Sequence, residues 1–327
     1  MKLATLKDGS PDGRLVVVAR NLHLAAEASA IAPTMQFLLE HWDACAPRLE
    51  TLFQALNADD APNAFAFDPA QAMAPLPRAY QFVDASAFLN HGSIMERAFN
   101  LTVKVPAGVP ILIQRQADDF RGPCDDYAFP SEADNCDFEG EVAAITGPIP
   151  MGADPARCEA GIRLFALFND VSMRGHLGRE LAMGFGFIQA KPATVFAPVA
   201  VTPDELGDAW QDGRVALDMN VSRNGEWFGH PNGREMDFSF GQLLSHLAYN
   251  RNLGGGTVLG TGTFSNRDHR SVGSSCLAEQ RALEVLEHGE ARTPFISFGE
   301  RLRFEMLNAA GESLFGAIDN RYVATEE

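Results

Sequence analysis

The sequence predicts a mainly β protein of the α+β class, and two observations support this prediction. Short runs rich in β-branched and apolar residues recur between glycine- and proline-containing turns over most of the 327 residues. Long helical periodicity is scarce, and the clearest examples lie near the N-terminus. Together these features predict a small α+β unit followed by a larger, mostly β domain.

The N-terminal unit should open with a hairpin, because apolar residues 3–6 and 15–19 flank the turn-forming stretch KDGSPDGR. Two helices are expected next. Thr34 is placed to cap the first, which would run through Trp42. Pro47 fits the first turn of the second, since proline is tolerated there.

A linker is expected at residues 59–77, where periodicity is lost and prolines accumulate. The chain is too long for one average domain of roughly 100–200 residues and too short for three. We therefore place a boundary near Pro75, which divides the chain into domains at 1–75 and 76–327.

The larger domain contains a series of short segments with the character of strands. They are residues 101–105, 110–114, 141–145, 163–168, 215–221, 256–260 and 295–299.

Composition excludes several classes of function. A formal charge of -17 repels phosphate backbones and anionic lipid, so neither nucleic acid nor a membrane surface is an expected partner. With 46% hydrophobic and 21% charged residues, a folded globular protein is expected. The first residues lack an apolar signal segment, and no run of about 18 apolar residues occurs. The expected location is cytoplasmic.

The five cysteines are odd in number, scattered, and without a C-x-x-C pair. This spacing argues against a disulfide framework and against a thiolate zinc site.

Asp84 and His91 are the first candidate functional residues. They lie seven residues apart, so both would project from one side of the segment if it were helical throughout. The alternative is that Asp84 only caps a short helix, as Ser86 could also do, and that His91 is an ordinary histidine.

A second candidate group lies in the sequence NCDFEGEVAAITG. A strand would place Asp137, Glu139 and Glu141 on one face. The segment could be a solvated edge strand. It continues into apolar residues 142–145, however, and carboxylates packed beside a core need a counter-charge, which a bound cation would supply.

Asp170 and Lys191 complete the candidates from pattern alone. Asp170 follows the apolar run RLFALF, where a buried strand would emerge into a loop. Oxygen ligands without paired histidines or thiolates favour hard cations such as Mg²⁺, Mn²⁺ or Ca²⁺.

Lys191, one of only four lysines, lies in an uncharged glycine-rich stretch, although a surface lysine would also fit. The glycine-rich GGGTVLGTGTFSN lacks a phosphate-loop ending and indicates close backbone approach to a ligand.

These segments resemble the fumarylacetoacetate hydrolase superfamily. The motifs QFVDASAFLNH, DFEGEVA, FNDVSMRG, GFGFIQAKP and GTGTF occur in the order typical of that family, from about Tyr80 to the C-terminus, with a weaker likeness before it. The resemblance implies a mixed β-roll of stacked sheets, a small barrel-like N-terminal domain and a homodimer. It also implies that Asp84, Glu139, Glu141 and Asp170 bind a divalent metal.

The resemblance further implies the roles of the remaining site residues. His91 matches the general base, and Glu279, at a slightly different spacing, matches the carboxylate that orients it. Lys191 and Arg174 match positions that stabilise an oxyanion, and Thr263 matches a residue that contacts substrate.

The implied reaction is hydrolysis of a carbon–carbon bond in a β-diketo, acylpyruvate-like acid. A decarboxylase, hydratase or isomerase of 2-oxo acids would use the same kind of metal site, and a metal-stabilised binding module without catalysis is a further alternative. Ser86, Leu177 and Leu181 stand where fumarylacetoacetate hydrolases have tyrosines and a glutamine. We therefore expect a substrate that is different from fumarylacetoacetate, or less polar.

Overall fold

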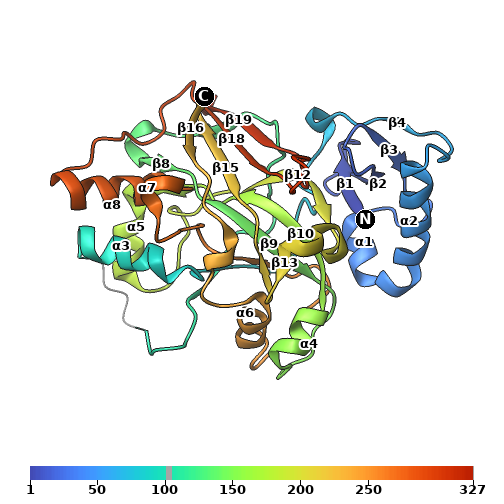
Figure 1. Ribbon diagram of the computed structural model, residues 1–327, viewed down its shortest axis with the longest axis horizontal. Helices are drawn as coiled ribbons and strands as arrows, with labels where there is room; N and C mark the ends of the chain where they lie inside the picture. The colour runs from blue at the N-terminus through green and yellow to red at the C-terminus, as the bar shows by residue number, and fades with distance from the viewer. Residues whose placement is uncertain (101–104, 327) are drawn as a thin grey trace.

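The computed structural model describes residues 1–100 and 105–326. The N-terminal segment, blue in Figure 1, lies at one end of the molecule, and the larger remainder surrounds a set of central strands. The mixed α+β, sheet-rich architecture confirms the predicted fold class.

A ten-stranded mixed sheet forms the centre of the structure. In spatial order its strands are β4 (Phe65–Ala66), β3 (Leu24–Glu27), β2 (Arg14–Val18), β1 (Lys2–Leu6), β12 (Val195–Val201), β10 (Ile162–Asn169), β9 (Gly140–Thr146), β17 (Val258–Gly260), β5 (Phe82–Ala85) and β6 (Leu112–Arg115). The pairing of β17 with β5 is parallel, and every other neighbouring pair in this sheet is antiparallel.

A five-stranded sheet and two small ribbons accompany the central sheet. The five strands in spatial order are β16 (Glu226–Gly229), β15 (Met219–Arg223), β18 (Arg301–Met306), β19 (Ile318–Ala324) and β7 (Tyr127–Phe129). The ribbons pair β8 (Cys136–Asp137) with β11 (Ser172–Met173), and β13 (Trp210–Gln211) with β14 (Arg214–Val215).

The α-helices lie around the sheets (Figure 1). They are α1 (Met35–Glu40), α2 (Trp42–Asn57), α3 (Leu89–Phe99), α4 (Pro155–Ala160), α5 (Arg174–Met183), α6 (Phe240–Leu247), α7 (His269–Val272) and α8 (Leu277–His288).

Both faces of the central sheet are buried, which explains why β9 is apolar at successive positions rather than at alternate ones. Val142 and Ala144 belong to the core that also contains residues of the five-stranded sheet. Ala143 and Ile145 point the other way, into the core that contains residues of α1 and α2. The sheet therefore separates two hydrophobic cores.

The predicted N-terminal hairpin is confirmed, because β1 and β2 pair in antiparallel register from Lys2 opposite Val18 to Leu6 opposite Arg14. The Oγ1 atom of Thr34 accepts a hydrogen bond from the Phe37 amide and caps α1, as expected. The position expected for Pro47 is wrong, since α2 already begins at Trp42 and Pro47 lies inside it.

The strand predicted at residues 295–299 is also wrong, because that segment has no regular structure. Four of the residues in the predicted strand at 101–105 lie outside the described residues. The other strand predictions in the larger domain correspond to strands whose ends differ by a few residues.

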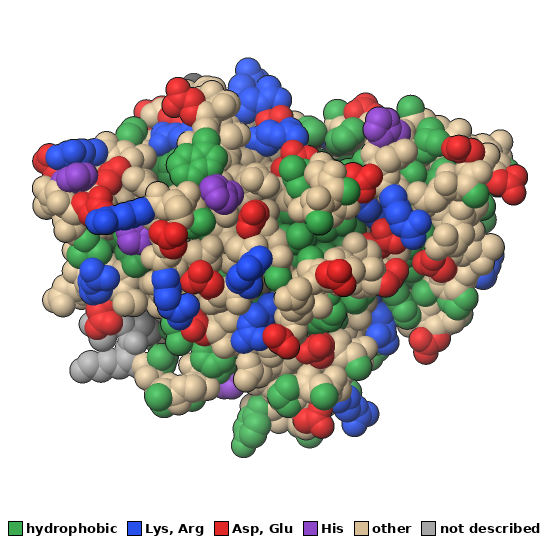
Figure 2. Space-filling view, viewed as in Figure 1, with side chains coloured by type: hydrophobic (Ala, Val, Ile, Leu, Met, Phe, Trp, Pro, Cys, Tyr) green, Lys and Arg blue, Asp and Glu red, His purple; other side chains and the backbone are tan. Residues whose placement is uncertain are grey.

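The segment before Pro75 and the larger part share the central sheet, since β1 pairs with β12 with Lys2 opposite Val201. The division at residues 1–75 and 76–327 stays a prediction. No helix in the described part of the chain is long and apolar enough to cross a membrane. All five cysteines are free thiols. Figure 2 shows acidic and basic side chains interspersed over one face.

We predict that Phe168→Ala lowers the free energy of unfolding by about 3–5 kcal/mol, because removal of a buried aromatic ring leaves a cavity. The Phe168 ring is fully buried and stacks on Phe196 with centroids 5.3 Å apart. Urea unfolding followed by circular dichroism measures the loss. Phe185→Ala, at a ring that is 95% exposed, is the control and should change stability little. Equal effects of both substitutions would contradict the described packing.

Candidate metal centre and adjoining cavity

Three carboxylates meet at one edge of the central sheet. Asp84 lies in β5, Glu141 lies in β9, and Asp170 directly follows β10. One oxygen of each lies within 4.8 Å of the others, and all three side chains are buried. The strand order β10, β9, β17, β5 brings these residues together although 86 positions separate the first from the last.

Strand periodicity explains why the carboxylates share a face. Phe82 precedes Asp84 by two residues, and Phe168 precedes Asp170 by two. Both phenylalanines belong to the core on the α1 and α2 side of the sheet. Because alternate residues of a strand point to the same face, the carboxylates continue this core face at its edge. They are therefore buried beside apolar packing.

Gly260 at the end of β17 provides the space for the carboxylates. A Cβ atom at this position would lie 2.5 Å from Oδ1 of Asp84 and 3.2 Å from Oε2 of Glu141. Two residues later, the Gly262 amide donates to Oε2 of Glu141 at 2.7 Å and to Oδ1 of Asp84 at 3.2 Å. The glycines predicted to bring backbone close to a ligand thus bring backbone close to the acidic cluster.

Asp170 is held by two buried cations. Its Oδ2 atom accepts from Nζ of Lys191 at 2.6 Å, and its Oδ1 atom accepts from Nε of Arg115 at 3.1 Å. Arg115 also donates through Nη2 to the same oxygen. Burial lowers the pKa of Lys191, but Asp170 and Glu139 more than offset this effect, so its pKa is raised and the amine stays charged.

Glu139 lies next to the three clustered carboxylates, on the other side of Lys191. Its Oε2 atom accepts from Nζ of Lys191 at 3.1 Å and from Oγ1 of Thr263 at 2.9 Å. Its Oε1 atom accepts from Arg174. Burial opposes ionisation, but Lys191 and Arg174 hold the pKa of Glu139 well below its ordinary value. The structure thus brings three of the four predicted ligands together, and the role of Glu139 as a ligand stays a prediction.

Asp137 connects the carboxylate cluster to α8. Its Oδ2 atom accepts from Nε of Arg174 at 2.8 Å and from the amide of Ala278 at 3.0 Å. Its Oδ1 atom accepts from the amide of Leu277 at 2.8 Å. One buried carboxylate therefore fixes a guanidinium group and the first turn of a helix, where negative charge is favourable.

His91 and Glu279 form a hydrogen-bonded pair between α3 and α8. Nδ1 of His91 lies 2.8 Å from Oε2 of Glu279, which is fully buried. Oε1 of Glu279 accepts from Oγ of Ser274 at 3.3 Å. Ile94 of α3 packs against Leu283 of α8 and holds the two helices together.

The pKa values of the clustered carboxyl groups show that the cluster is short of positive charge. Burial, followed by repulsion from Asp170, raises the pKa of Asp84 from 3.8 to about 7. Burial and repulsion from Asp84 and Asp170 raise the pKa of Glu141 well above its ordinary value. Protons or a cation must therefore compensate these groups.

Counting charges in the connected network gives the size of the deficit. Within the described part of the chain, five carboxylates are joined to three cations, which leaves two negative charges uncompensated when all five are ionised. The carboxylates are Asp84, Asp137, Glu139, Glu141 and Asp170, and the cations are Arg115, Arg174 and Lys191.

One divalent cation would balance this deficit, and the donor set fits such an ion. Oε1 of Glu141 is buried without a hydrogen-bond partner among the described residues, whereas its Oε2 is bonded. A buried, unpaired carboxylate oxygen is costly, and it becomes favourable when it coordinates an ion. Carboxylate oxygens without thiolates suit Mg²⁺, Mn²⁺ or Ca²⁺.

A cavity of about 190 Å³ adjoins the carboxylates. The predicted site residues that line it are Asp84, His91, Glu139, Arg174, Lys191 and Thr263. Glu279 lies behind His91, and Glu141 and Asp170 are connected to the cavity through their contacts with Asp84 and Lys191. The arrangement places a candidate base, two carboxylates and two cations around one space.

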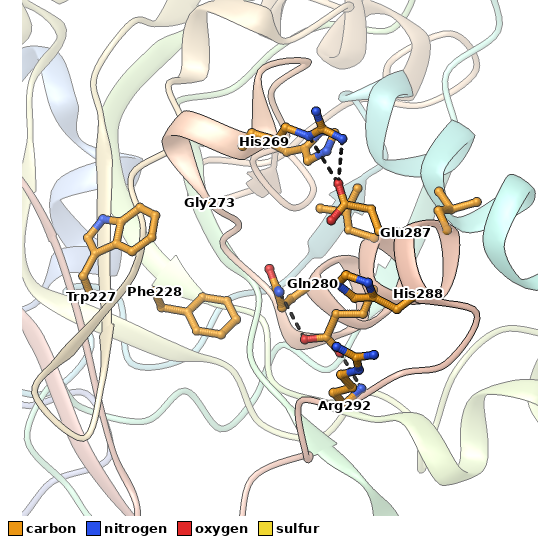
Figure 3. Close-up of a pocket in the computed structure, with 12 residues that line it drawn as sticks. Trp227, Phe228, His269, Gly273, Gln280, Glu287, His288 and Arg292 are labelled. Atoms are coloured by element: carbon orange, nitrogen blue, oxygen red, sulfur yellow. Dashed lines mark hydrogen bonds and ion pairs between the residues drawn. The ribbon is translucent and has the colours of Figure 1, made fainter.

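A wider hollow of about 920 Å³, shown in Figure 3, is lined largely by residues of α7 and α8 and shares no lining residue with this cavity. Two pairs of its lining side chains are hydrogen-bonded to each other. Nη2 of Arg270 donates to Glu287 at 3.0 Å, and Gln280 donates to Glu284 at 3.2 Å. We place the candidate site at the carboxylate cluster rather than at this hollow, because the buried carboxylates lack enough positive charge to balance them.

Three interpretations from the sequence are corrected by this geometry. Asp84 does not cap a helix, because it lies inside β5 and α3 begins only at Leu89. The segment from Asp137 to Glu141 is neither one continuous strand nor a solvated edge, because Asp137 lies in β8, which pairs with β11, and Glu141 lies in β9, between β10 and β17, and both side chains are fully buried. Lys191 is likewise buried rather than on the surface.

Arg115 was missed by the sequence interpretation. The strand predicted at residues 110–114 ends one residue before it, and a charged residue at a strand end usually faces solvent. Its burial depends on Asp170, 55 residues further along the chain. The only local signal was the position of Arg115 directly after an apolar run.

Comparisons with known proteins show which family models the sequence matches. Residues 82–323 match the family model described as "Fumarylacetoacetate (FAA) hydrolase C-terminal", and residues 1–78 match "Fumarylacetoacetase N-terminal domain 2". A 2,4-didehydro-3-deoxy-L-rhamnonate hydrolase of Sphingomonas sp. (strain SKA58) is 29% identical over 157 residues, which are 47% of this chain and 52% of the relative. The chain spans about half the length of the curated relatives it matches.

Solved structures share the fold. Maleylpyruvate hydrolase from Sphingobium sp. SYK-6, in complex with manganese(II) ion and pyruvate, aligns with a TM-score of 0.67 at 17% identity over 100% of both chains. Fumarylacetoacetate hydrolase from Exiguobacterium antarcticum aligns with a TM-score of 0.66 at 19% identity over 99% of this chain and 100% of its own.

We predict that a divalent cation stabilises the protein more at pH 8 than at pH 5. Without metal, the raised pKa of Asp84 means that folding takes up a proton between pH 3.8 and about 7. The stability that this proton provides is present at low pH and is lost as pH rises through about 7. A bound cation replaces the proton, so the difference in melting temperature between MgCl₂ and EDTA should grow over that range.

Glu141→Gln should abolish the metal-dependent shift while the metal-free protein remains folded, because the amide resembles the protonated carboxyl. Glu226→Gln, at an exposed position, is the matched control and should keep the shift. A shift that is independent of pH, or equal in both variants, would contradict a metal site at Glu141.

Proposed function

Since the chain belongs to the fumarylacetoacetate hydrolase family, we propose that it is a metal-dependent hydrolase that cleaves a carbon–carbon bond in a β-diketo acid. Asp84, Glu141 and Asp170, with Glu139 beside them, would hold the cation. When bound, a divalent ion supplies Lewis-acid polarisation of the substrate carbonyl. The manganese(II) and pyruvate in the maleylpyruvate hydrolase structure are consistent with this class of site.

The observation that carries the proposal is the pairing of His91 with Glu279 at the cavity. Because Nδ1 of His91 is 2.8 Å from Oε2 of Glu279, the carboxylate orients the ring and stabilises its protonated form. Nε2 is then the nitrogen that takes a proton from water. This general base is the feature that favours hydrolysis over isomerisation or decarboxylation of a 2-oxo acid.

The remaining steps follow from the positions of the donors. The oxygen of the deprotonated water forms a bond to the carbonyl carbon, and the adjacent carbon–carbon bond breaks with its electron pair on the departing carbon. The resulting enolate takes a proton, so the products are a carboxylic acid and a 2-oxo acid. Thr263 donates to Glu139 from the cavity wall and fixes the orientation of that carboxylate.

Arg174 and Lys191 retain hydrogens for an anionic oxygen. Nη1 of Arg174 donates to no described residue, whereas its Nε and Nη2 are engaged by Asp137 and Glu139. Nζ of Lys191 donates to two carboxylates and keeps a third hydrogen. Both groups are preorganised, so they would stabilise charge that develops on the enolate.

We predict that His91→Ala lowers the rate constant for disappearance of diketo-acid ultraviolet absorbance by about 10²–10⁴-fold, because a general base contributes that much. Glu279→Gln should also reduce the rate, since the amide cannot stabilise a protonated ring. His23→Ala, at an exposed position, is the control and should not change it. Turnover that is unaffected by His91→Ala would contradict the assignment.

Product analysis separates the proposed reaction from its alternatives. A hydrolase consumes one water and forms two acids. A decarboxylase releases CO₂, a hydratase adds water without cleavage, and an isomerase leaves the mass unchanged. A metal-stabilised binding module would show the metal-dependent melting shift without any product.

A further inference from the structure

The cavity at the carboxylates has one charged end and one apolar end. Two helices line it, and the residues that they contribute change in character along each helix. On α5, Arg174, Leu177 and Leu181 are spaced three and four residues apart and therefore share one helical face. Arg174 contacts Glu139 at the charged end, so the two leucines extend the wall away from it.

The same change occurs on the facing wall. His91 and Met95 of α3 are four residues apart and share a face. Ile113, from β6, and Phe187, which follows α5, complete the apolar surface. A substrate held at the metal end would therefore place the far end of its acyl group among aliphatic and aromatic side chains.

Among the described residues, no cation lines the apolar end of the cavity, where it could pair with a second carboxylate. The cationic side chains among its lining residues are Arg174 and Lys191, with His91 as a titratable third. Both permanent cations are already engaged with Glu139, and Lys191 also with Asp170, at the charged end. A carboxylate at the apolar end would be partly desolvated against aliphatic and aromatic side chains without a counter-charge, which is unfavourable.

We infer that the substrate is a monocarboxylic β-diketo acid whose acyl arm ends in an uncharged alkyl or aryl group, and that Leu177 and Leu181 determine this preference. The inference rests on the proposed function for the position of the diketo acid, and it adds the chemistry of the distal arm. It excludes dicarboxylic acyl-pyruvates as good substrates.

A matched pair of ligands tests the preference. 7-Methyl-2,4-dioxooctanoate and 2,4-dioxoheptanedioate have the same diketo acid and the same spacer, and they differ in carrying a branched alkyl or a carboxylate terminus. We predict a roughly 10–100-fold higher kcat/KM for the alkyl compound with Mg²⁺ present, because the alkyl end gains apolar contact whereas a partly desolvated, unpaired carboxylate is unfavourable. Calorimetric binding of both compounds to His91→Ala should show the same order of affinity without turnover.

Leu181→Arg should reverse the preference by pairing the distal carboxylate. Leu181 is 43% exposed at the rim of the cavity, so a longer side chain can be accommodated. Met183→Arg is the control, because it adds the same charge at a 60% exposed position that does not line the cavity. The control should keep the preference of the wild type, which separates pairing inside the cavity from a general change in charge.

The outcomes distinguish this inference from the proposed function. Equal or tighter binding of the dicarboxylate to His91→Ala, binding of neither compound, or a reversal in Met183→Arg as large as in Leu181→Arg would overturn the inference. Tighter binding of the alkyl compound without turnover by the wild type would support the apolar subsite and contradict the hydrolase. Turnover of both compounds at equal kcat/KM would agree with the proposed hydrolase activity, but it would contradict the proposed preference for an uncharged acyl arm.

Discussion

An imbalance of two negative charges in a buried network is the constraint on which the rest of this structure depends. Five connected carboxylates are matched by three cations, at a sheet edge that continues a hydrophobic core. Such a network cannot remain ionised and dry without a further positive charge. Three features are related to this charge imbalance. The order of four strands brings the carboxylates together, Gly260 leaves space for them, and the pKa of Asp84 is raised to about 7.

The charge network also organises the parts that would perform chemistry. Asp137 holds Arg174 and the first amides of α8, and the same helix carries Glu279 to His91. A change at the carboxylates would therefore be transmitted to the candidate base through one buried side chain. Arg174 is in turn the first residue of α5, whose later residues form the apolar wall of the cavity. The carboxylate cluster, the candidate base and the apolar wall are therefore connected through Asp137 and Arg174.

The sequence predicted the parts of the site whose signal is local. Asp170 was found because it follows an apolar strand, and Lys191 because lysine is rare in this chain. Glu141 was found because alternation places it beside core residues. Local pattern does not decide the role of Asp84, because the sequence around it resembles a helix start. Only the pairing of its strand with β17 and β6 shows that it is part of the sheet.

The remaining features depend on contacts that local patterns do not encode. Burial of Arg115 requires Asp170, and the capping role of Asp137 requires a helix that begins 140 residues later. The polarity change along the cavity needs α3 and α5 to face one space, which their separate periodicities do not reveal. The resemblance to a family implies that the four carboxylates bind one metal ion together. The structure shows the buried charges around them that explain why a cation would be needed.

The most direct test of the charge account is a crystal structure of the protein soaked with Mn²⁺, with anomalous diffraction measured at the manganese edge. We predict one strong anomalous peak coordinated by Asp84, Glu141 and Asp170, with Oε1 of Glu141 as a ligand. A fully ordered site without a peak there, or a peak bound only elsewhere, would contradict it.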